Sequence, residues 1–377
     1  MAGQRKGKQK RGIDDPVLYA GCTDEAEQAD RRRLLAELHA QGASFEMLEE
    51  AVREERLATL PVEFALSDGS RYTLTEVARE AGVDPRYARA VLLSLGHPNP
   101  RPRERRFSDR DIEVARILRV FLDAGMPKDE ILEVSRVIGQ SMARTAAAVR
   151  RVVGNSLLSP GDSELELGMR YAEAARQLAP LMGPVMQQQL EVHLREQVTR
   201  EVITRADRES GTLGRTRDVG VCFADLSGFT RLGQRLPPDE IGAIGNRMAE
   251  MAGAVALPPV ELVKTIGDGV MLVSRSPSAL LGAAIDLRGR IREEGIEFPP
   301  MRAGIAHGAA VQRSGDWFGP VVNCASRITD VARPGTIVLE EQAYELASDG
   351  HEWSKRKRKR LKGIDGRVGL YTLQAVE

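Results

Sequence analysis

The stretch Phe223-Ala-Asp-Leu-Ser-Gly-Phe-Thr230 decides how the C-terminal half of this 377-residue chain is interpreted. The apolar run from Val219 to Ala224 predicts a strand buried on both faces, and this strand ends at Asp225. The chain then turns into a helix that we expect to begin near Thr230. Backbone N–H groups at such a helix start can hold phosphate oxygens beside the carboxylate. The candidate phosphate-binding residues are Ser227, Gly228, Phe229 and Thr230.

A second motif, Lys264-Thr-Ile-Gly-Asp-Gly-Val-Met271, places a further carboxylate in a tight turn. The segments Val260–Ile266 and Gly269–Val273 on either side predict a β-hairpin with Asp268 at its tip. Two carboxylates that converge at strand ends can hold two divalent ions, one that activates a nucleophile and one that neutralises triphosphate charge. Asp268 and Asp225 are therefore candidate metal ligands.

The third motif is Asp316-Trp-Phe-Gly-Pro-Val-Val-Asn-Cys-Ala-Ser-Arg327. Asn323 and Arg327 lie four residues apart on an expected helix, so both side chains point to one face, and Asp316 precedes them in a loop. The alternation of segments around the three motifs predicts an α+β fold in which helices cover one face of a sheet. The further expected strands are 301–311 and 335–339, and the expected helices are about 238–254, 278–293 and 320–332.

In this order and spacing, the three motifs resemble those of the class III adenylate cyclases, over residues 217–372. Two lesser landmarks of that family also match, namely Arg302-Ala-Gly-Ile-Ala-His-Gly308 and the closing Leu361-Lys-Gly-Ile. The resemblance implies a ferredoxin-like catalytic domain that converts ATP to cyclic AMP and pyrophosphate. It also implies two Mg²⁺ or Mn²⁺ ions in each active site.

The resemblance assigns roles to individual residues. Asp225 and Asp268 would hold the two metal ions. Lys264 and Asp316 would read adenine, because the lysine donates to the ring N1 and the aspartate accepts from the exocyclic amine. Guanine presents the opposite pattern of donors and acceptors, which disfavours a guanylate cyclase.

The last two roles fall to the third motif. Asn323 would orient the ribose, and Arg327 would stabilise charge on the α-phosphate as the 3′-oxygen attacks it. Members of the family work as dimers, with metal ligands from one chain and with base, ribose and transition-state residues from the other. Because this chain carries all of these residues, the resemblance implies a homodimer with two equivalent composite sites.

The chain is expected to have three parts. Residues 1–20 are predicted to form a disordered basic tail, and residues 209–377 the catalytic domain. Residues 21–208 predict an all-α regulatory domain. Within it, residues 72–139 resemble a divergent MerR-type helix-turn-helix, with a turn at Gly82.

A connecting helix is predicted over residues 184–208, after breaks at Pro180 and at Gly183-Pro184. Apolar residues repeat along it every four positions, which suits pairing with another helix. These residues are Met186, Leu190, Leu194, Val198 and Val202.

His193 lies beside this apolar stripe. One interpretation is a structural histidine at the edge of a packed seam, and the other is a proton-sensitive joint, because imidazole titrates near neutral pH. The whole architecture resembles actinobacterial cyclases whose helical N-terminal domain inhibits the enzyme and releases it in acid. Fatty-acid binding by the helical domain is the alternative regulatory signal within that group.

Charge and composition narrow the class of protein. Lys+Arg and Asp+Glu each number 54, so the chain as a whole has no bulk attraction for nucleic acid or an anionic membrane. Cys22, Cys222 and Cys324 are scattered without metal-ligand spacing, which argues for a reducing compartment. No stretch has the pattern of a secretory signal or a membrane span, so we expect a cytoplasmic protein.

A second hypothesis is a DNA-binding regulator whose cyclase-like domain only senses nucleotide. Arg86 and Arg89 on the second helix of the helix-turn-helix could contact phosphates, as could the basic run Lys355–Arg360. Acidic neighbours oppose the first patch, and the second precedes a closing strand, where a solvated face is expected. A pure sensor would also not need Arg327, so DNA is not an expected partner.

Overall fold

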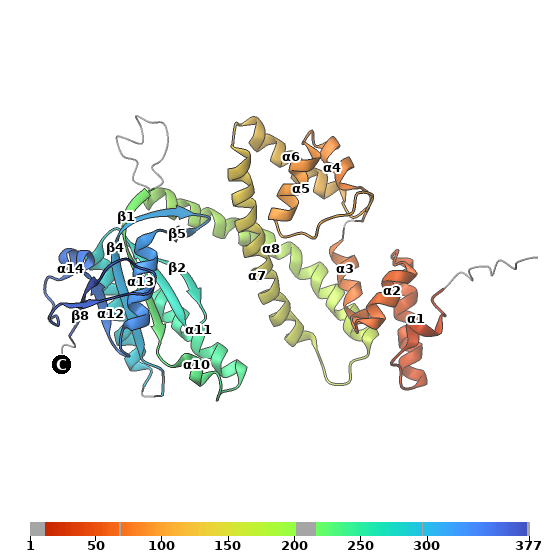
Figure 1. Cartoon of the computed structure of the whole chain (residues 1–377). Coiled ribbons are helices and arrows are strands. Elements are labelled where there is room, and N and C mark those ends of the chain that lie inside the picture. The colour runs from red at the N-terminus through yellow and green to blue at the C-terminus, as the bar shows by residue number, and fades with distance from the viewer. Residues whose placement is uncertain (1–11, 68, 201–215, 296, 375–377) are drawn as a thin grey trace, which may run out of the picture. The chain divides into compact units, whose positions relative to one another are not determined.

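The computed structural model describes residues 12–67, 69–200, 216–295 and 297–374. The chain divides into two compact units, Met1–Val202 and Ile203–Glu377. The first unit is helical, and the second combines a sheet with helices (Figure 1). The domain boundary predicted at residues 208–209 lies outside the described residues.

The helical unit begins with a small bundle around a leucine core. Leu18 is fully buried in this core, so residues 16–20 do not belong to the predicted disordered tail. Ser44 caps the N-terminus of α2, since its side chain accepts from the Met47 N–H. The elements of the bundle are η1 (Pro16–Tyr19), α1 (Glu25–Ala40), α2 (Phe45–Arg53), η2 (Leu57–Thr59) and α3 (Leu60–Leu66).

The predicted helix-turn-helix is present as a pair of short helices. Thr73 and Glu76 form a capping box at the start of α4, and Asp84 caps α5. Gly82 makes the turn between them with a φ of 67°. The likeness to MerR-type domains in particular stays a prediction. The elements are α4 (Leu74–Glu80), α5 (Pro85–Ser94), α6 (Asp109–Asp123) and the long α7 (Lys128–Leu157).

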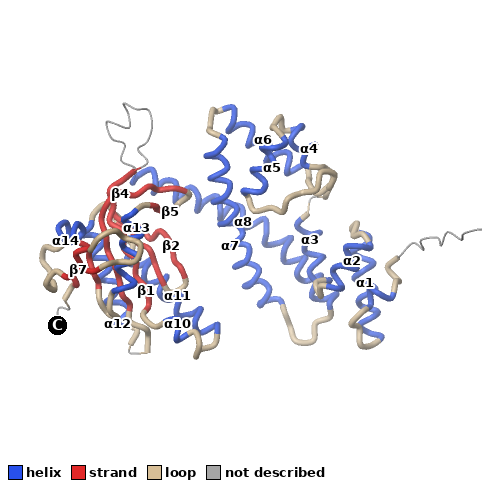
Figure 2. The backbone as a smooth tube through the Cα atoms, in the orientation of Figure 1, coloured by secondary structure: helices blue, strands red, loops and turns tan. Residues whose placement is uncertain are grey.

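The last helix of the unit, α8 (Glu164–Arg200), runs without interruption through Pro180 and Pro184 (Figure 2). The predicted breaks are therefore wrong. A proline removes one N–H from the ladder of hydrogen bonds, and a long helix can absorb this by bending while the turns on both sides persist. The later part of the connecting helix, residues 201–208, lies outside the described residues.

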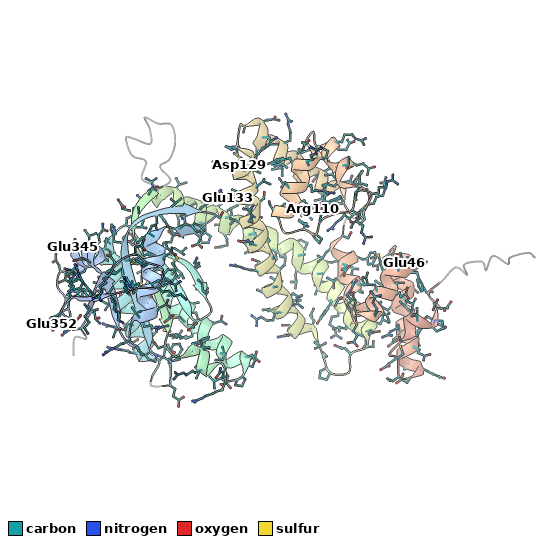
Figure 3. All side chains as sticks on the ribbon, viewed as in Figure 1. Glu46, Arg110, Asp129, Glu133, Glu345 and Glu352 are labelled. Atoms are coloured by element: carbon teal, nitrogen blue, oxygen red, sulfur yellow. The ribbon has the colours of Figure 1, made fainter. Side chains whose placement is uncertain are left out.

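The apolar stripe on α8 faces outward within the helical unit. Leu190, Leu194 and Val198 are 60%, 54% and 74% exposed. Charged side chains such as Glu46 on α2 and Arg110 on α6 are also exposed (Figure 3). The stripe is therefore an apolar surface that this unit does not cover by itself.

The second unit contains one sheet with the strand order β2-β3-β1-β4-β6-β8-β7, and β5 pairs with β4. Its first four strands follow the ferredoxin-like order β4-β1-β3-β2, with antiparallel neighbours, as predicted. The strands are β1 (Thr216–Leu226), β2 (Val260–Ile266), β3 (Gly269–Ser274), β4 (Met301–Arg313), β5 (Asp316–Phe318), β6 (Ile337–Glu340), β7 (Lys357–Lys359) and β8 (Val368–Thr372).

Helices cover both faces of this sheet, so the prediction of a single covered face is wrong. One core joins the sheet to α11, α12 and α14, and a second core joins its other face to α13. The strands carry apolar residues on both sides, as Val221 and Cys222 of β1 show, and each side needs a cover. The helices are α10 (Phe229–Leu232), α11 (Pro238–Val255), α12 (Pro277–Glu293), α13 (Pro320–Val331) and α14 (Glu341–Ala347).

Gly304 lets α13 lie directly against the sheet. A Cβ atom at this position would lie 2.5 Å from the Thr329 nitrogen and 2.6 Å from the Ala325 oxygen, both in the backbone of α13. Thr329 is buried, and its hydroxyl donates to the Phe223 carbonyl oxygen over 3.1 Å. This contact ties the C-terminal turn of α13 to β1, the strand that carries Asp225.

The Gly304→Ala variant is expected to be destabilised by about 1–3 kcal/mol and to lose most of its activity, because α13 must move away from the sheet. Gly289→Ala is the matched control, since Gly289 is exposed on α12 and a Cβ there meets nothing within 4 Å. The control should gain up to about 1 kcal/mol from helix propensity. Thermal unfolding and cyclase assays measure both, and equal stability of the two variants would contradict the close packing.

Candidate active site

The two predicted metal ligands lie at neighbouring strand ends. Asp225 pairs with Gly269, the first residue of β3, and Asp268 occupies the β2–β3 turn just before it. Burial raises the pKa of the Asp268 carboxyl, and the negative charge of Asp225 adds to this rise. The turn therefore concentrates negative charge that a divalent cation would offset. Two such carboxylates, one of them partly desolvated, fit the oxygen ligands that Mg²⁺ and Mn²⁺ prefer.

Arg302 contacts this pair, although no role was predicted for it. It stands opposite Asp225 in the β1–β4 ladder, and its Nε and Nη2 donate to the two carboxylate oxygens over 2.7 Å and 3.0 Å. These bonds raise the pKa of the guanidinium. In the sequence, Arg302 is visible only as the first residue of the matched segment Arg302-Ala-Gly-Ile-Ala-His-Gly308. The register of β4 against β1 is what identifies Asp225 as its partner.

The predicted turn from strand to helix after Asp225 is present, while phosphate binding by it stays a prediction. Gly228 has a φ of 84° and precedes the single-turn helix α10, as a tight strand-to-helix turn requires. The Ser227 N–H, however, donates to the Pro300 carbonyl oxygen over 2.8 Å, so it is not free to hold a phosphate. This correction arises because β1 and β4 continue their pairing past Asp225. The Ser227 hydroxyl is buried and has no hydrogen-bond partner among the described residues.

The two predicted adenine-reading residues meet directly. Lys264 lies on β2 and Asp316 opens β5, and the lysine ammonium donates to Oδ2 of the aspartate. The other carboxylate oxygen accepts from the Trp317 N–H over 2.8 Å. A bulge between Leu262 and Lys264 shifts the register of β2 just before the lysine. Both side chains keep about a third of their surface exposed, which leaves them reachable by a ligand.

Asn323 and Arg327 both lie on the side of α13 that turns away from the sheet. The opposite side of the helix buries Val321, Ala325 and Ile328 in the second core. Arg327 Nη1 donates to Oδ2 of Asp330 over 2.9 Å. No hydrogen bond or ion pair within the described part of the chain joins these residues or the Lys264–Asp316 pair to the two metal-ligand candidates.

Both units match known protein families. Residues 13–198 match the model of the adenylate cyclase regulatory domain, and residues 212–375 match that of the adenylate and guanylate cyclase catalytic domain. The chain is also 34% identical over 373 residues to the pH-sensitive adenylate cyclase MT1302 of Mycobacterium tuberculosis, covering 96% of this chain and 91% of that protein. The chain belongs to the class III adenylate cyclases with an N-terminal regulatory domain.

Two further relatives are similar to most of this chain. The uncharacterized protein Rv2212 of Mycobacterium tuberculosis is 31% identical over 341 residues, covering 89% of this chain and 87% of that protein. An adenylate cyclase of Streptomyces griseus is 32% identical over 284 residues, covering 73% of this chain and 67% of that protein.

Two further predicted features, His193 and the basic run Lys355–Arg360, lie outside the candidate active site. His193 lies on α8 with 70% of its side chain exposed, and its Nδ1 is 3.9 Å from Oε2 of Glu196. It is therefore not packed within the helical unit. The basic run includes β7, the last strand in the sheet order, whose three side chains are exposed. This confirms the expected solvated strand face.

No helix among the described residues combines the length and apolarity needed to cross a membrane.

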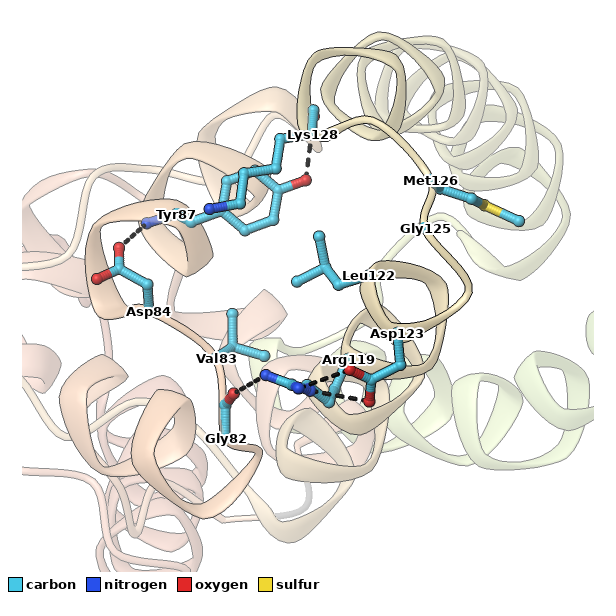
Figure 4. A pocket seen from close by; sticks show the side chains of 10 residues that line it. All are labelled: Gly82, Val83, Asp84, Tyr87, Arg119, Leu122, Asp123, Gly125, Met126 and Lys128. Carbon is cyan, nitrogen blue, oxygen red and sulfur yellow. Dashed lines mark hydrogen bonds and ion pairs between the residues drawn. The ribbon is translucent and has the colours of Figure 1, made fainter.

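The regulatory unit of the cyclase also has an open hollow between the α4–α5 turn and the α6–α7 turn (Figure 4). Its charged groups are already engaged. Arg119 donates to the Gly82 carbonyl oxygen and pairs with Asp123, and the Lys128 ammonium lies 5.3 Å from the centroid of the Tyr87 ring. None of the predicted site residues lines this hollow.

Proposed function

We propose that this adenylate cyclase forms 3′,5′-cyclic AMP and pyrophosphate from ATP in two composite sites, each built from two copies of the chain. The direct contact of Lys264 with Asp316 is the observation that carries the base preference. A lysine donor beside a carboxylate acceptor complements N1 and the exocyclic amine of adenine. On guanine the pattern is reversed, because N1 carries a donor hydrogen and the neighbouring O6 is an acceptor.

Asp225 and Asp268 would hold two Mg²⁺ or Mn²⁺ ions at the ends of β1 and of the β2–β3 hairpin. When bound, these ions would activate the ribose 3′-hydroxyl and offset the charge of the triphosphate. Burial, together with the nearby charge of Asp225, raises the pKa of the Asp268 carboxyl, and a bound divalent cation would offset that cost of ionisation. Arg302 keeps the Asp225 carboxylate in one orientation through two hydrogen bonds.

Asn323 and Arg327 would complete the site on the substrate. The amide of Asn323 would fix the ribose so that its 3′-oxygen faces the α-phosphate. The guanidinium of Arg327 would donate to the oxygens of that phosphate as charge builds on them. Such an enzyme needs no covalent intermediate, because phosphoryl transfer depends mainly on positioning and charge neutralisation. The N–H groups of Gly228, Phe229 and Thr230 remain the candidates for holding the triphosphate.

The presence of all of these residues in one chain, with no direct hydrogen bond or ion pair among the described residues between the metal-ligand candidates and the base, ribose and phosphate candidates, supports a homodimer. A symmetric pair would place the metal ligands of each chain against the base, ribose and phosphate residues of the other. A monomer would then be inactive, and a small rotation between the catalytic units would assemble or separate each site.

The base preference can be measured directly. The full-length protein is expected to make cyclic AMP from Mn²⁺-ATP with a kcat/KM at least about tenfold above that for cyclic GMP from Mn²⁺-GTP, because a mismatched donor leaves buried polar groups unpaired. Equal values for both nucleotides would contradict the assignment of Lys264 and Asp316.

We further propose that the helical unit regulates the cyclase according to pH, because the Mycobacterium tuberculosis relative is named a pH-sensitive adenylate cyclase. His193 is the candidate sensor. It is exposed beside the apolar stripe of α8, so a helix that packs on the stripe would bring it into contact with a new environment. Its protonation would then add a charge at that seam.

The pH–activity profiles of the full-length protein and of residues 209–377 are expected to differ, and His193→Ala should make the full-length profile resemble that of the shorter protein. His97→Ala is the matched control, because His97 is also exposed in the helical unit and should leave the profile unchanged. If the two wild-type profiles coincide, regulation by pH through the helical unit is wrong.

A further inference from the structure

Asp330, in the last turn of α13, contacts two arginines that serve different parts of the cyclase. Its carboxylate Oδ2 accepts from Arg327 Nη1 over 2.9 Å. Its main-chain carbonyl oxygen accepts from Arg302 Nη1 over 3.0 Å, while the other nitrogens of Arg302 hold Asp225. Asp330 therefore contacts both Arg327, the candidate ligand of the α-phosphate, and Arg302, which holds the candidate metal ligand Asp225.

The backbone around Asp330 is held firmly. The preceding residue, Thr329, is buried and bonded to the Phe223 carbonyl oxygen, and Gly304 brings the sheet against the same turn. The carboxylate of Asp330 thus projects from a fixed point. Its side chain is 51% exposed and that of Arg327 is 43% exposed, and an ion pair this open contributes little to folding.

The ion pair between Arg327 and Asp330 contributes little to stability, but it can orient the guanidinium of Arg327. A guanidinium carries five N–H donors on three nitrogens in a rigid plane. Asp330 occupies only Nη1, and Nε and Nη2 of Arg327 donate to no other group among the described residues. A long side chain held at one nitrogen loses fewer rotamers when the others bind an anion, so less entropy opposes the productive geometry.

We propose that Asp330 is a positioning residue for Arg327, which holds one guanidinium nitrogen so that the other two face the α-phosphate of ATP. This inference rests on the proposed role of Arg327. Asp330 acts through its carboxylate on Arg327 and through its main chain on Arg302, so a side-chain substitution separates the two contacts.

The test uses full-length Asp330→Ala with Mn²⁺-ATP. The kcat is expected to fall about tenfold, because the arginine is free to leave the reactive position. KM for ATP and the Mn²⁺ concentration at half-maximal rate should stay within about twofold, since the carbonyl that holds Arg302 is retained. Asp330→Asn keeps an acceptor without the charge and should recover part of the lost kcat.

Glu250→Ala is the matched control. It removes an exposed i, i+3 ion pair of similar length, Arg247 Nη1 to Glu250 Oε2 at 3.0 Å on α11, and should leave kcat unchanged. An Asp330→Ala enzyme with unchanged kcat would overturn the inference. So would a tenfold shift in the Mn²⁺ requirement or a drop in the unfolding temperature that accounts for the loss, because either would indicate a structural role for the helix end.

Complementation separates this inference from the shared-site proposal. Mixed with Asp225→Ala, the Asp330→Ala protein should regain activity, because one site of the mixed dimer is then intact. Mixed with Lys264→Ala it should not, because both sites are damaged. If Asp225→Ala and Lys264→Ala complement each other but Asp330→Ala gains with both or with neither, the assignment of Asp330 to Arg327 fails while the shared site stands.

Discussion

Asp225→Ala and Lys264→Ala proteins are each expected to be nearly inactive, with kcat at least about 100-fold below that of the wild type, yet an equal mixture should regain activity. In a homodimer with composite sites, Asp225 and Lys264 of one chain serve opposite sites. A mixed dimer then has one site with both lesions and one site with neither. Random pairing makes half of the dimers mixed, so the mixture should reach about one quarter of wild-type activity.

The measurement is cyclic AMP production after the two variants are mixed and allowed to exchange subunits. A mixture of Lys264→Ala with Asp316→Ala is the control, because both residues belong to the same group and no intact site can form. Activity in the control equal to that in the first mixture would contradict the division of residues. A first mixture that stays inactive, while mixed dimers are shown to form, would contradict the shared site itself.

Arg327→Ala should lower kcat by about 10²–10³-fold with little change in KM for ATP. The guanidinium would donate to α-phosphate oxygens whose charge grows only as the 3′-oxygen attacks, so its loss weakens binding of the transition state more than binding of ATP. Arg327→Lys keeps the positive charge but not the fork of donors, and should recover only part of the loss.

Single-turnover and steady-state assays with Mn²⁺-ATP measure this effect. Arg247→Ala, which removes a half-exposed arginine on α11 that also pairs with acidic residues, is the control and should keep kcat within about twofold. A rise in KM at constant kcat for Arg327→Ala would show that the arginine binds ATP and its transition state equally, and the proposed role would be wrong.

Much of the catalytic unit was predictable because its signals are local. The apolar run before Asp225, the Gly-Asp hairpin at Asp268 and the four-residue spacing of Asn323 and Arg327 each specify a strand, a turn or a helix face. The contact of Lys264 with Asp316 joins residues 52 positions apart, and the order of the family motifs predicted that they act together. The sequence also indicated the helix pair around Gly82, because caps and turn residues act within a few positions.

The incorrect predictions concern features that depend on packing, on strand register or on the whole length of a helix. The placement of helices on both faces of the sheet depends on where α13 packs, which no local pattern states. Pro180 and Pro184 indicated breaks, but the helical hydrogen bonds on both sides of them outweigh the lost donors. The Ser227 N–H was expected to be free, but the strand register of β1 against β4 assigns it to the Pro300 carbonyl oxygen.

The sequence by itself determined the family of this cyclase, since its three motifs occur in the order and spacing of the class III adenylate cyclases, and that resemblance assigns the roles proposed for the carboxylates, the lysine–aspartate pair and the arginine. Only the tertiary structure decided how those groups are held. Arg302 reaches Asp225 because β4 lies beside β1 in one register, and the Asp330 main-chain carbonyl reaches Arg302 because Gly304 lets the end of α13 lie against β4. Contacts of this kind join residues far apart in the chain, so they appear only when packing brings the elements together.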